Sequence, residues 1–409
     1  MPQNTDARPP CIVLGLETQI GLGIVRELGR AGVTVIGIAH EAAAIGLVSR
    51  YLARGLVVAE PRGSQLIATI RALGEELGEC CLMAVSEVNL AWLAANRDSF
   101  GRVRVVAPTP ASLQMVLDKQ RTLHAARTLG IAIPETAEPA SMADAVRLAN
   151  CFRFPAVLKW KDPAAVAAAL GAAGLPLLKA EYVYSPAEFL AAAQRYLPLG
   201  QWPLMQEYCP GYGLGQFFYM HEQRAIRRFQ HVRVAEWPPE GGFSSVCDAL
   251  PLECHAALQE QSIALLHLIG WDGVAMVEYR VDPLTGNAVL MEINGRYWGS
   301  YPLAVECDAG FALIAYCLHS KLDVPPLPPI REGIRCRMIA TEVKRLVRIC
   351  LRPGLIADKS FRIDPWFELK RFILDFFRPR VGYYVWSWTD PRPFFADIGN
   401  LVRKRLLRA

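Results

Sequence analysis

Two carboxylates and an amide are spaced as oxygen ligands along two neighbouring strand-like segments. Glu278 lies in the first segment, and Glu292 and Asn294 lie in the second. The residues between the segments are turn formers, so we expect an antiparallel hairpin in which Asp282 pairs with Ala288. Glu278 then lies directly opposite Glu292, and Asn294 lies on the same face two residues further on.

Like charges directly opposite each other on a sheet repel, and the apolar neighbours of this pair make the repulsion stronger. A cation would relieve it. A set of oxygen ligands that includes two carboxylates suits Mg²⁺, with Mn²⁺ as an alternative. The other interpretation is an exposed hairpin with two solvated glutamates. We disfavour it because it leaves the spacing of Asn294 and Arg296 unexplained.

Lys159 follows an apolar strand-like run, Phe154-Pro-Ala-Val-Leu. A lysine in such a strand is costly unless an anion accompanies it, which favours a functional role over that of a surface lysine. Lys119 lies at an expected helix start and would carry little weight alone.

The pattern E…E-x-N-x-R, formed by Glu278, Glu292, Asn294 and Arg296, resembles the ATP-grasp carboxylate–amine ligases. The ATP-grasp domain of the carbamoyl-phosphate synthase large chain is the particular likeness. The resemblance implies ATP and magnesium as cofactors, with the two glutamates and the asparagine holding the metal. It implies that Arg296 contacts phosphate or an acyl-phosphate intermediate, for which a planar guanidinium is suited.

The resemblance extends upstream. It implies that Lys119 and Lys159 lie near the phosphates. The segment implied to grip adenine comprises Gln206, Glu207, Tyr208 and Cys209. Gln216 stands where many relatives have an acidic residue near the ribose, and the expected phosphate-covering loop after Lys159 is rich in alanine, with only Gly171 and Gly174.

Four residues, Arg233, Gly241, Gly242 and Ser244, resemble the strand and glycine loop that face the acyl substrate in the same family. A turn with a hairpin arginine explains them equally well, so both interpretations stay open. We expect the segment Trp298–Tyr301 to line the same cavity. His231 is as consistent with a structural histidine as with a base.

The expected fold is α/β, with α+β character in the grasp portion. Short apolar strands alternate with a helical segment at the N-terminus, which predicts a parallel sheet of Rossmann type. A single helix is expected over 112–129, ending at Gly130. The expected domains are a Rossmann-like pre-ATP-grasp domain (1–107), a small lid subdomain with its linker helix (108–204), a metal-binding catalytic subdomain (205–320) and a helical, basic C-terminal extension (321–409).

Several other enzyme classes lack their motifs. The glycines Gly15, Gly21 and Gly23 do not have the G-x-G-x-x-G spacing of dinucleotide-binding proteins, and a tight strand-to-helix turn explains them. The sequence contains no G-x-x-x-x-G-K-[ST] and no G-x-S-x-G, which disfavours P-loop enzymes and Ser/His/Asp hydrolases.

Composition favours a cytoplasmic protein. The first ten residues lack the pattern of a secretory signal, and no apolar run approaches the roughly 20 residues of a spanning helix. The 11 cysteines are scattered without metal-site spacing, which fits reduced thiols.

Charge is unevenly distributed along the 409 residues. Residues 321–409 hold 19 Lys and Arg against 9 Asp and Glu, whereas residues 1–320 hold 25 against 30. Segments 366–377 and 401–408 combine basic and bulky apolar residues at helical spacing. Packed helices and weak peripheral contact with anionic membranes both account for this pattern.

The sequence therefore predicts an ATP- and Mg-dependent ligase that activates a carboxylate as an acyl phosphate for attack by an amine or similar nucleophile. The alternative is an ATP-binding protein of the same fold without ligase activity. The expected partners are small molecules, without nucleic acid, and a homodimer stays open.

Overall fold

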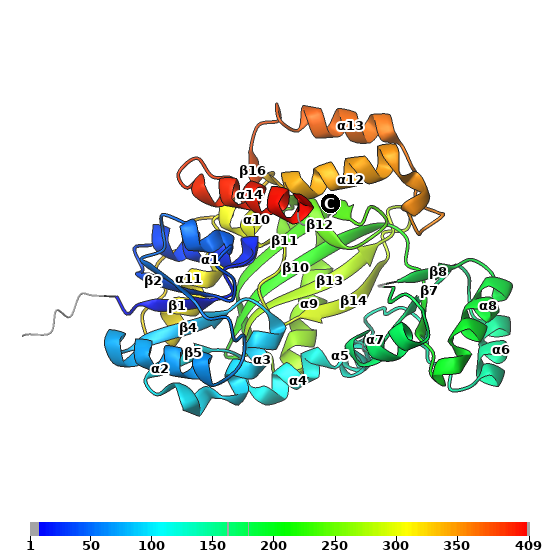
Figure 1. Cartoon of the computed structure of the whole chain (residues 1–409), viewed down its shortest axis with the longest axis horizontal. Helices are drawn as coiled ribbons and strands as arrows, with labels where there is room; N and C mark the ends of the chain where they lie inside the picture. The colour runs from blue at the N-terminus through cyan, green and yellow to red at the C-terminus, as the bar shows by residue number, and fades with distance from the viewer. Residues whose placement is uncertain (1–7, 162, 179, 407–409) are drawn as a thin grey trace, which may run out of the picture.

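Three β-sheets organise the chain in the computed structural model, which describes residues 8–161, 163–178 and 180–406 (Figure 1). Side chains are described in these ranges except at 163, 164 and 404–406. The N-terminal sheet lies beside a large central sheet, and a small sheet stands apart at the right of the view. The mixed α/β class is confirmed.

The N-terminal sheet has the order β3-β2-β1-β4-β5 and is parallel throughout. Its strands are β1 (Cys11–Leu14), β2 (Val35–Ala39), β3 (Arg54–Val57), β4 (Cys80–Ala84) and β5 (Val103–Val106). Its helices are α1 (Gln19–Arg30), α2 (Ser64–Leu77) and α3 (Glu87–Ala95), with short 3-10 turns η1 (Ile45–Val48) and η2 (Arg97–Phe100). The expected βαβ opening is confirmed.

The glycines in the turn from β1 into α1 are required by close backbone packing. A Cβ on Gly21 would lie 2.1 Å from the carbonyl oxygen of Gly15, and Gly15 itself has a φ of +111°. Only glycine fits this approach of helix and strand.

Two helices, α4 (Pro110–Leu117) and α5 (Lys119–Thr128), replace the single helix expected over 112–129. Asp118 separates them because its carboxylate accepts hydrogen bonds from the backbone N–H of Gln120 at 3.0 Å and of Arg121 at 3.2 Å. It is thus the N-cap of α5. Gly130 takes the expected left-handed conformation, with a φ of +69°.

The small sheet has the order β6-β9-β7-β8 and is antiparallel. Its strands are β6 (Thr136–Ala137), β9 (Leu204–Glu207), β7 (Ala156–Lys159) and β8 (Glu181–Val183). Its helical elements are α6 (Met142–Cys151), α7 (Pro163–Ala172), α8 (Pro186–Tyr196) and the 3-10 turn η3 (Leu197–Leu199). The expected alanine-rich loop after Lys159 was wrong, because its alanines, good helix formers, build α7.

The central sheet has the order β14-β13-β10-β11-β12-β15-β16. Its strands are β10 (Tyr212–His221), β11 (Arg224–Trp237), β12 (Phe243–Ala249), β13 (Gly273–Val281), β14 (Ala288–Asn294), β15 (Arg335–Arg337) and β16 (Val381–Tyr383). Around it lie η4 (Leu252–His255), α9 (Ala256–Leu268), α10 (Tyr301–Glu306) and α11 (Phe311–His319).

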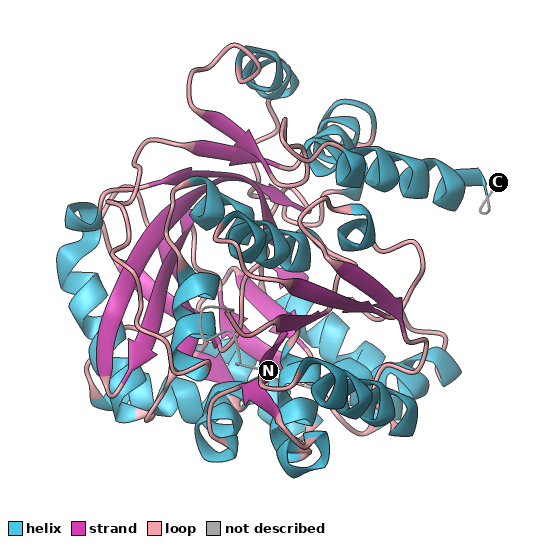
Figure 2. Cartoon of the chain, turned by 90° about the vertical axis from the view of Figure 1, so that its left-hand side faces the viewer, coloured by secondary structure: helices cyan, strands magenta, loops and turns pink. Residues whose placement is uncertain are grey.

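The N-terminal and central sheets share their hydrophobic cores. One core joins β1 residues such as Val13 to Phe217 and Trp298, and the other joins Ile12 to Tyr279. The small sheet has a core of its own, which includes Leu158 and Phe189. The first two sheets therefore form one body, which Figure 2 shows from the side of the N-terminal sheet, and the small sheet is attached to it (Figure 1).

The C-terminal extension contains α12 (Ile339–Leu351), η5 (Pro353–Leu355), α13 (Pro365–Leu374) and α14 (Arg392–Leu406). It also supplies β15 and β16, so the expectation of a purely helical extension was incomplete. These strands continue the central sheet at its edge. No helix in the described ranges is long and apolar enough to cross a membrane. All 11 cysteines are free thiols.

Candidate active site

The β13–β14 hairpin places Glu278 opposite Glu292, as expected. The register at the turn differs from the expected one, because Val281 rather than Asp282 pairs with Ala288. A shift of register between Glu278 and Tyr279 then restores the expected pairing. The hairpin was therefore predicted correctly in its outcome, whereas its bulge was missed.

Arg233 supplies the first counter-charge. Its guanidinium contacts Glu278 and lies 3.0 Å from Glu236, whose other oxygen lies 3.1 Å from Arg280. To reach Glu278 from β11, Arg233 crosses β10 at Gly213, where a Cβ would lie 2.5 Å from the arginine side chain. Any larger residue at position 213 would block the path of the arginine side chain to Glu278.

The loop after β11 holds Arg233 from the other side. Gly242 accepts a hydrogen bond from its guanidinium at 2.8 Å through the backbone carbonyl. A Cβ on Gly242 would lie 2.1 Å from the carbonyl oxygen of Trp237, and Gly241 has a φ of +147°. The two glycines thus have a conformational role in presenting a carbonyl to Arg233.

Lys119 supplies the second counter-charge. Its ammonium lies 3.2 Å from Glu292, and the amide of Asn294 donates to the other oxygen of Glu292 at 3.1 Å. The helix N-terminus capped by Asp118 holds Lys119 at this position.

The pKa values of the two glutamates are shifted in opposite directions. Burial raises the pKa of Glu278, and the charge of Glu292 adds to this, against the opposing effect of Arg233. Burial alone would raise the pKa of Glu292 as well, but Lys119 and the hydrogen bond from Asn294 together lower it. Burial opposes the charge of Arg233, yet Glu278 and Glu236 outweigh it and raise the pKa of the guanidinium.

Lys159 approaches this cluster from the small sheet. Its ammonium donates a hydrogen bond to the side-chain carbonyl of Gln206 at 3.0 Å. Burial and the positive charge of Lys119 lower the pKa of Lys159 to about 8, and Glu292 and Glu278 act in the opposite direction. Residues of two separate sheets are therefore within electrostatic range of one another.

Arg296 joins the cluster to the N-terminal body. It donates to the side-chain oxygen of Asn294 at 2.9 Å and to the backbone carbonyl of Tyr297 at 3.0 Å. Its guanidinium also lies 3.5 Å from Glu87 at the start of α3. Burial raises the pKa of Glu87 although Arg296 opposes this effect.

The segment Gln206–Cys209 leaves the small sheet towards the central one. The backbone N–H of Glu207 donates a hydrogen bond to the backbone carbonyl of Glu135 at 2.8 Å. Burial raises the pKa of the Cys209 thiol to about 11, so that it is protonated at neutral pH. Tyr208 turns its hydroxyl away from the cluster and donates to Asp358 of the C-terminal extension at 2.9 Å.

Gln216 lies on the opposite face of the central sheet, and the structure does not bring it to the cluster. Its neighbour Gly215 pairs with Glu278, and side chains alternate along a strand. Gln216 is fully buried, donates to Gln230 at 3.2 Å and accepts from Ser262 of α9 at 2.7 Å. Its expected position near a ribose is therefore not supported by this geometry.

Trp298 and Tyr301 belong to the core between the two larger sheets, so the expectation that they line a cavity was wrong. Trp298 stacks on Phe217 with a ring separation of 3.8 Å. The hydroxyl of Tyr301 donates to Glu27 of α1 at 2.6 Å. His231 is buried beside Phe217, and burial lowers its pKa well below the usual value, so the ring is neutral.

Three contributors escaped the sequence analysis: Glu236, Glu87 and Gly213. Glu236 follows Arg233 by three residues in a strand. In a regular strand this spacing puts the two side chains on opposite faces, so the sequence predicts no contact between them unless a bulge is known. β11 has such irregularities between Arg233 and Glu236. Glu87 comes from a distant helix, and nothing in its local sequence distinguishes it.

The donor set fits a magnesium ion by its chemistry. Glu278, Glu292 and Asn294 offer carboxylate and amide oxygens on one face of one hairpin. Within the described ranges, no group of three or more His, Cys, Asp and Glu residues converges as metal ligands. A pair of carboxylates completed by water and phosphate oxygens is the usual form of magnesium binding.

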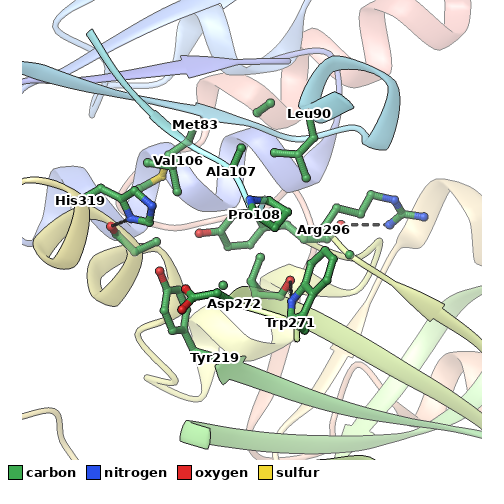
Figure 3. A pocket seen from close by; sticks show the side chains of 16 residues that line it. Met83, Leu90, Val106, Ala107, Pro108, Tyr219, Trp271, Asp272, Arg296 and His319 are labelled. Atoms are coloured by element: carbon green, nitrogen blue, oxygen red, sulfur yellow. Dashed lines mark hydrogen bonds between the residues drawn. The ribbon is translucent and has the colours of Figure 1, made fainter. Parts of the chain in front are cut away.

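A small cavity lies beside this cluster, between the N-terminal and central sheets (Figure 3). Met83, Leu90 and Val106 line it from one side, Tyr219 and Trp271 from the other. Its volume of about 40 Å³ admits no more than a few water molecules. It is too small for a nucleotide.

No protein-family model and no curated protein matches this sequence. Solved structures do. Biotin carboxylase from Campylobacter jejuni, in complex with β-γ-ATP, matches at 14% identity with a TM-score of 0.58, over 80% of this chain and 74% of that one. L-amino acid ligase from Bacillus licheniformis matches at 14% identity with a TM-score of 0.56, over 80% and 79%.

N5-carboxyaminoimidazole synthetase from Staphylococcus aureus matches at 10% identity with a TM-score of 0.57, over 82% of this chain and 83% of that one. These proteins are ATP-grasp enzymes, and this chain has their fold. The class that the sequence predicted is thereby confirmed at the level of the fold.

Proposed function

We propose that this protein is an ATP- and Mg-dependent ligase that joins a carboxylate to an amine or a similar nucleophile. One observation carries the proposal: from outside the hairpin, Lys119 lies 3.2 Å from Glu292, and Lys159 lies within electrostatic range of the opposed pair Glu278 and Glu292. A site that gathers cations and carboxylates from separate elements suits a ligand that carries both phosphate and metal.

Each residue then has a role that follows from its charge. Glu278, Glu292 and Asn294 would hold the magnesium ion, which would neutralise charge on the phosphate oxygens. Lys119 and Lys159 neutralise the remaining phosphate charge from the other side. Among the described residues, the ammonium of each lysine donates one hydrogen bond, and phosphate oxygens can replace that partner.

The reaction has two steps. A carboxylate oxygen of the substrate attacks the γ-phosphorus of ATP, the bond to ADP breaks, and an acyl phosphate forms. The amine nitrogen then attacks the acyl carbon, and inorganic phosphate leaves with the carbon–oxygen bond electrons. We assign the orientation of the acyl oxygens to Arg296 and Arg233, because a guanidinium binds such groups with two parallel donors.

The adenine is assigned to the backbone of the segment from Gln206 to Cys209, where the small sheet meets the central one. No nucleotide contact is assigned to Gln216. We further propose action on small molecules in the cytoplasm, without nucleic acid.

The test is release of ADP and phosphate by purified protein with Mg²⁺-ATP and a panel of amino acids and sugar acids as acids and amines. We expect release only when both an acid and a nucleophile are present. Protein with Glu278→Gln, purified in the same way, controls for contaminating ATPases. Tight ATP binding without turnover on any pair would instead favour the alternative, a nucleotide-binding protein without ligase activity.

A further inference from the structure

Helix α13 exposes most of its apolar residues, whereas its acidic residue Glu368 and Asp375 just beyond its end are buried. Trp366 at its start and Phe377 just beyond its end are each 81% exposed, whereas Glu368 is 7% and Asp375 is 4% exposed. The other exposed apolar side chains of this segment are Phe367, Leu369, Ile373, Leu374 and Phe376. A surface helix of a globular protein normally has the reverse arrangement.

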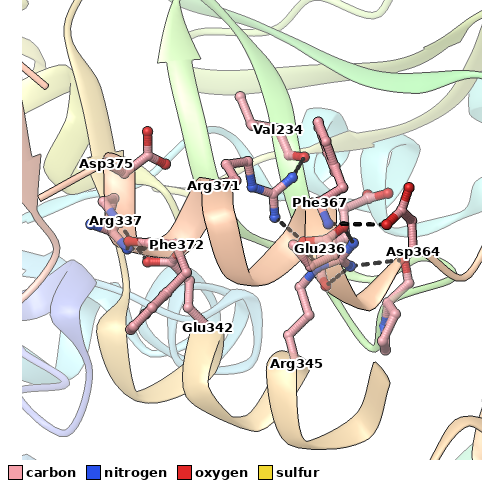
Figure 4. A network of polar contacts seen from close by, with 12 residues as sticks. Val234, Glu236, Arg337, Glu342, Arg345, Asp364, Phe367, Arg371, Phe372 and Asp375 are labelled. Atoms are coloured by element: carbon pink, nitrogen blue, oxygen red, sulfur yellow. Dashed lines mark hydrogen bonds and ion pairs between the residues drawn. The ribbon is translucent and has the colours of Figure 1, made fainter. Parts of the chain in front are cut away.

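Ion pairs hold the helix in this orientation (Figure 4). Glu368 lies 2.7 Å from Arg345 of α12 and also contacts Arg371, and Asp375 lies 2.7 Å from Arg335 of β15. Rotating the helix to bury its apolar face would leave these charges without partners, which is strongly unfavourable. The exposure of the apolar face is therefore built into the packing.

The charge exposed around this face is almost entirely positive. Most acidic residues of the segment 340–380 are buried, namely Glu342, Asp358, Glu368 and Asp375. The basic residues that remain exposed over 340–380 are Lys344, Arg352, Lys359, Arg362, Lys370, Arg378 and Arg380. Asp364, the N-cap of α13, is the partly exposed acid among them.

We infer that this face of α13 binds the surface of a membrane that contains anionic lipid. Trp366, Lys370, Ile373 and Phe377 are spaced by three or four residues, so along a helix they form one stripe. Aromatic rings at the level of the lipid headgroups and lysines beside them are the composition of an interfacial helix. This proposal goes beyond the ligase reaction and does not depend on it.

A second copy of the chain is the competing occupant. A two-fold dimer through this stripe would place Lys370 and its basic neighbours against their own copies. Such like charges repel, whereas an anionic lipid surface attracts them. The charge pattern therefore selects the membrane.

The experiment is sedimentation of the full chain with sucrose-loaded vesicles at low salt. We expect binding to vesicles of phosphatidylcholine and phosphatidylserine, and at least about tenfold weaker binding to pure phosphatidylcholine. Raising the salt concentration should release the protein, because exposed charges are then screened.

Two variants separate the apolar and the electrostatic contributions. Trp366→Ser with Phe377→Ser, and separately Arg362→Glu with Lys370→Glu, should each weaken binding at least about tenfold. The matched controls are Leu284→Ser, at the exposed tip of the β13–β14 hairpin, and Arg224→Glu, at the start of β11. Arg224 lies about 40 Å along β11 from Trp237, which contacts α12 through Arg348. Neither control should change binding.

Equal binding to both kinds of vesicle, or unchanged binding by both double variants, would overturn the proposal. So would a dimer in sedimentation velocity that the Trp366→Ser, Phe377→Ser variant dissociates, because a second copy would then cover the face. Circular dichroism of each variant verifies that α13 and its neighbours stay folded.

Discussion

Two clusters in this protein bury arginine and glutamate side by side, and they are organised differently. Beneath α13, Arg337 binds Glu342 through two hydrogen bonds, of 2.8 and 3.2 Å, within one short stretch of chain. Around the β13–β14 hairpin, Glu292 is met by Lys119 through a single contact of 3.2 Å, from a helix far away in the sequence.

The comparison teaches that buried charge alone does not identify a site. In the cluster beneath α13, the carboxylates of Glu342 and Glu368 each accept two hydrogen bonds from one arginine, so a ligand finds little to replace there (Figure 4). Asp375 differs, because within the described ranges one of its oxygens binds Arg335 and the other has no partner. In the hairpin cluster, Lys119 and Lys159 come from other elements, and each donates one hydrogen bond among the described residues. Their partners can be exchanged for phosphate at little cost.

The largest effect should come from breaking the ion-pair cluster beneath α13. Arg337→Ala removes a fully buried guanidinium that also lies 4.4 Å from the ring of Phe376. It leaves Glu342 charged and unpaired, so we expect the free energy of unfolding to fall by about 3–5 kcal/mol. Urea unfolding measures this. Arg224→Ala at an exposed position is the control, and equal stability of the two variants would refute the structural role.

Glu292→Gln should affect function and spare the fold. It keeps the shape of the side chain but removes a charge needed for magnesium, so we expect turnover to fall at least about 100-fold, or about 2.7 kcal/mol. Steady-state ADP release measures it, with the melting temperature recorded in parallel. Glu260→Gln, at an exposed site on α9, is the matched control. Full turnover by Glu292→Gln would show that the hairpin holds no metal.

The pH dependence of nucleotide binding tests Lys159. The ammonium attracts phosphate only when protonated, and the pKa of Lys159 in the free protein is lowered to about 8. Affinity for ATP should therefore be highest below about pH 8 and fall up to about tenfold per pH unit above it. Titration with a fluorescent ATP analogue from about pH 7 to about pH 9 measures this. Lys159→Arg keeps its charge, and an unchanged slope in that variant would assign the effect to another group.

Asp118→Ala should give the smallest effect. It removes the side-chain cap of α5 and should lower stability by about 1 kcal/mol. ATP affinity should fall slightly as well, because the first turn of α5 carries Lys119. Asp118→Asn retains a capping oxygen and should restore most of the stability. If both variants lost the same amount, the carboxylate charge rather than the cap would be responsible.

Local patterns predicted part of the geometry of the candidate site. The β13–β14 pairing was predicted from turn residues between two apolar runs. A functional role for Lys159 was predicted from its position in an apolar strand. Gln216 was misplaced because its face of the sheet depends on which neighbour pairs with Glu278. The extent of the lid, the catalytic subdomain and the extension remains a prediction.

The sequence by itself determined the local elements, because strand alternation, glycine turns and helix caps act over a few residues. The resemblance of Glu278, Glu292, Asn294 and Arg296 to the ATP-grasp pattern predicted the fold that the solved structures share. Only the tertiary structure decided which charges meet. Arg233 reaches Glu278 across Gly213, and α13 turns its apolar face outward over Arg345. These outcomes depend on burial and on partners distant in the chain, which no local pattern encodes.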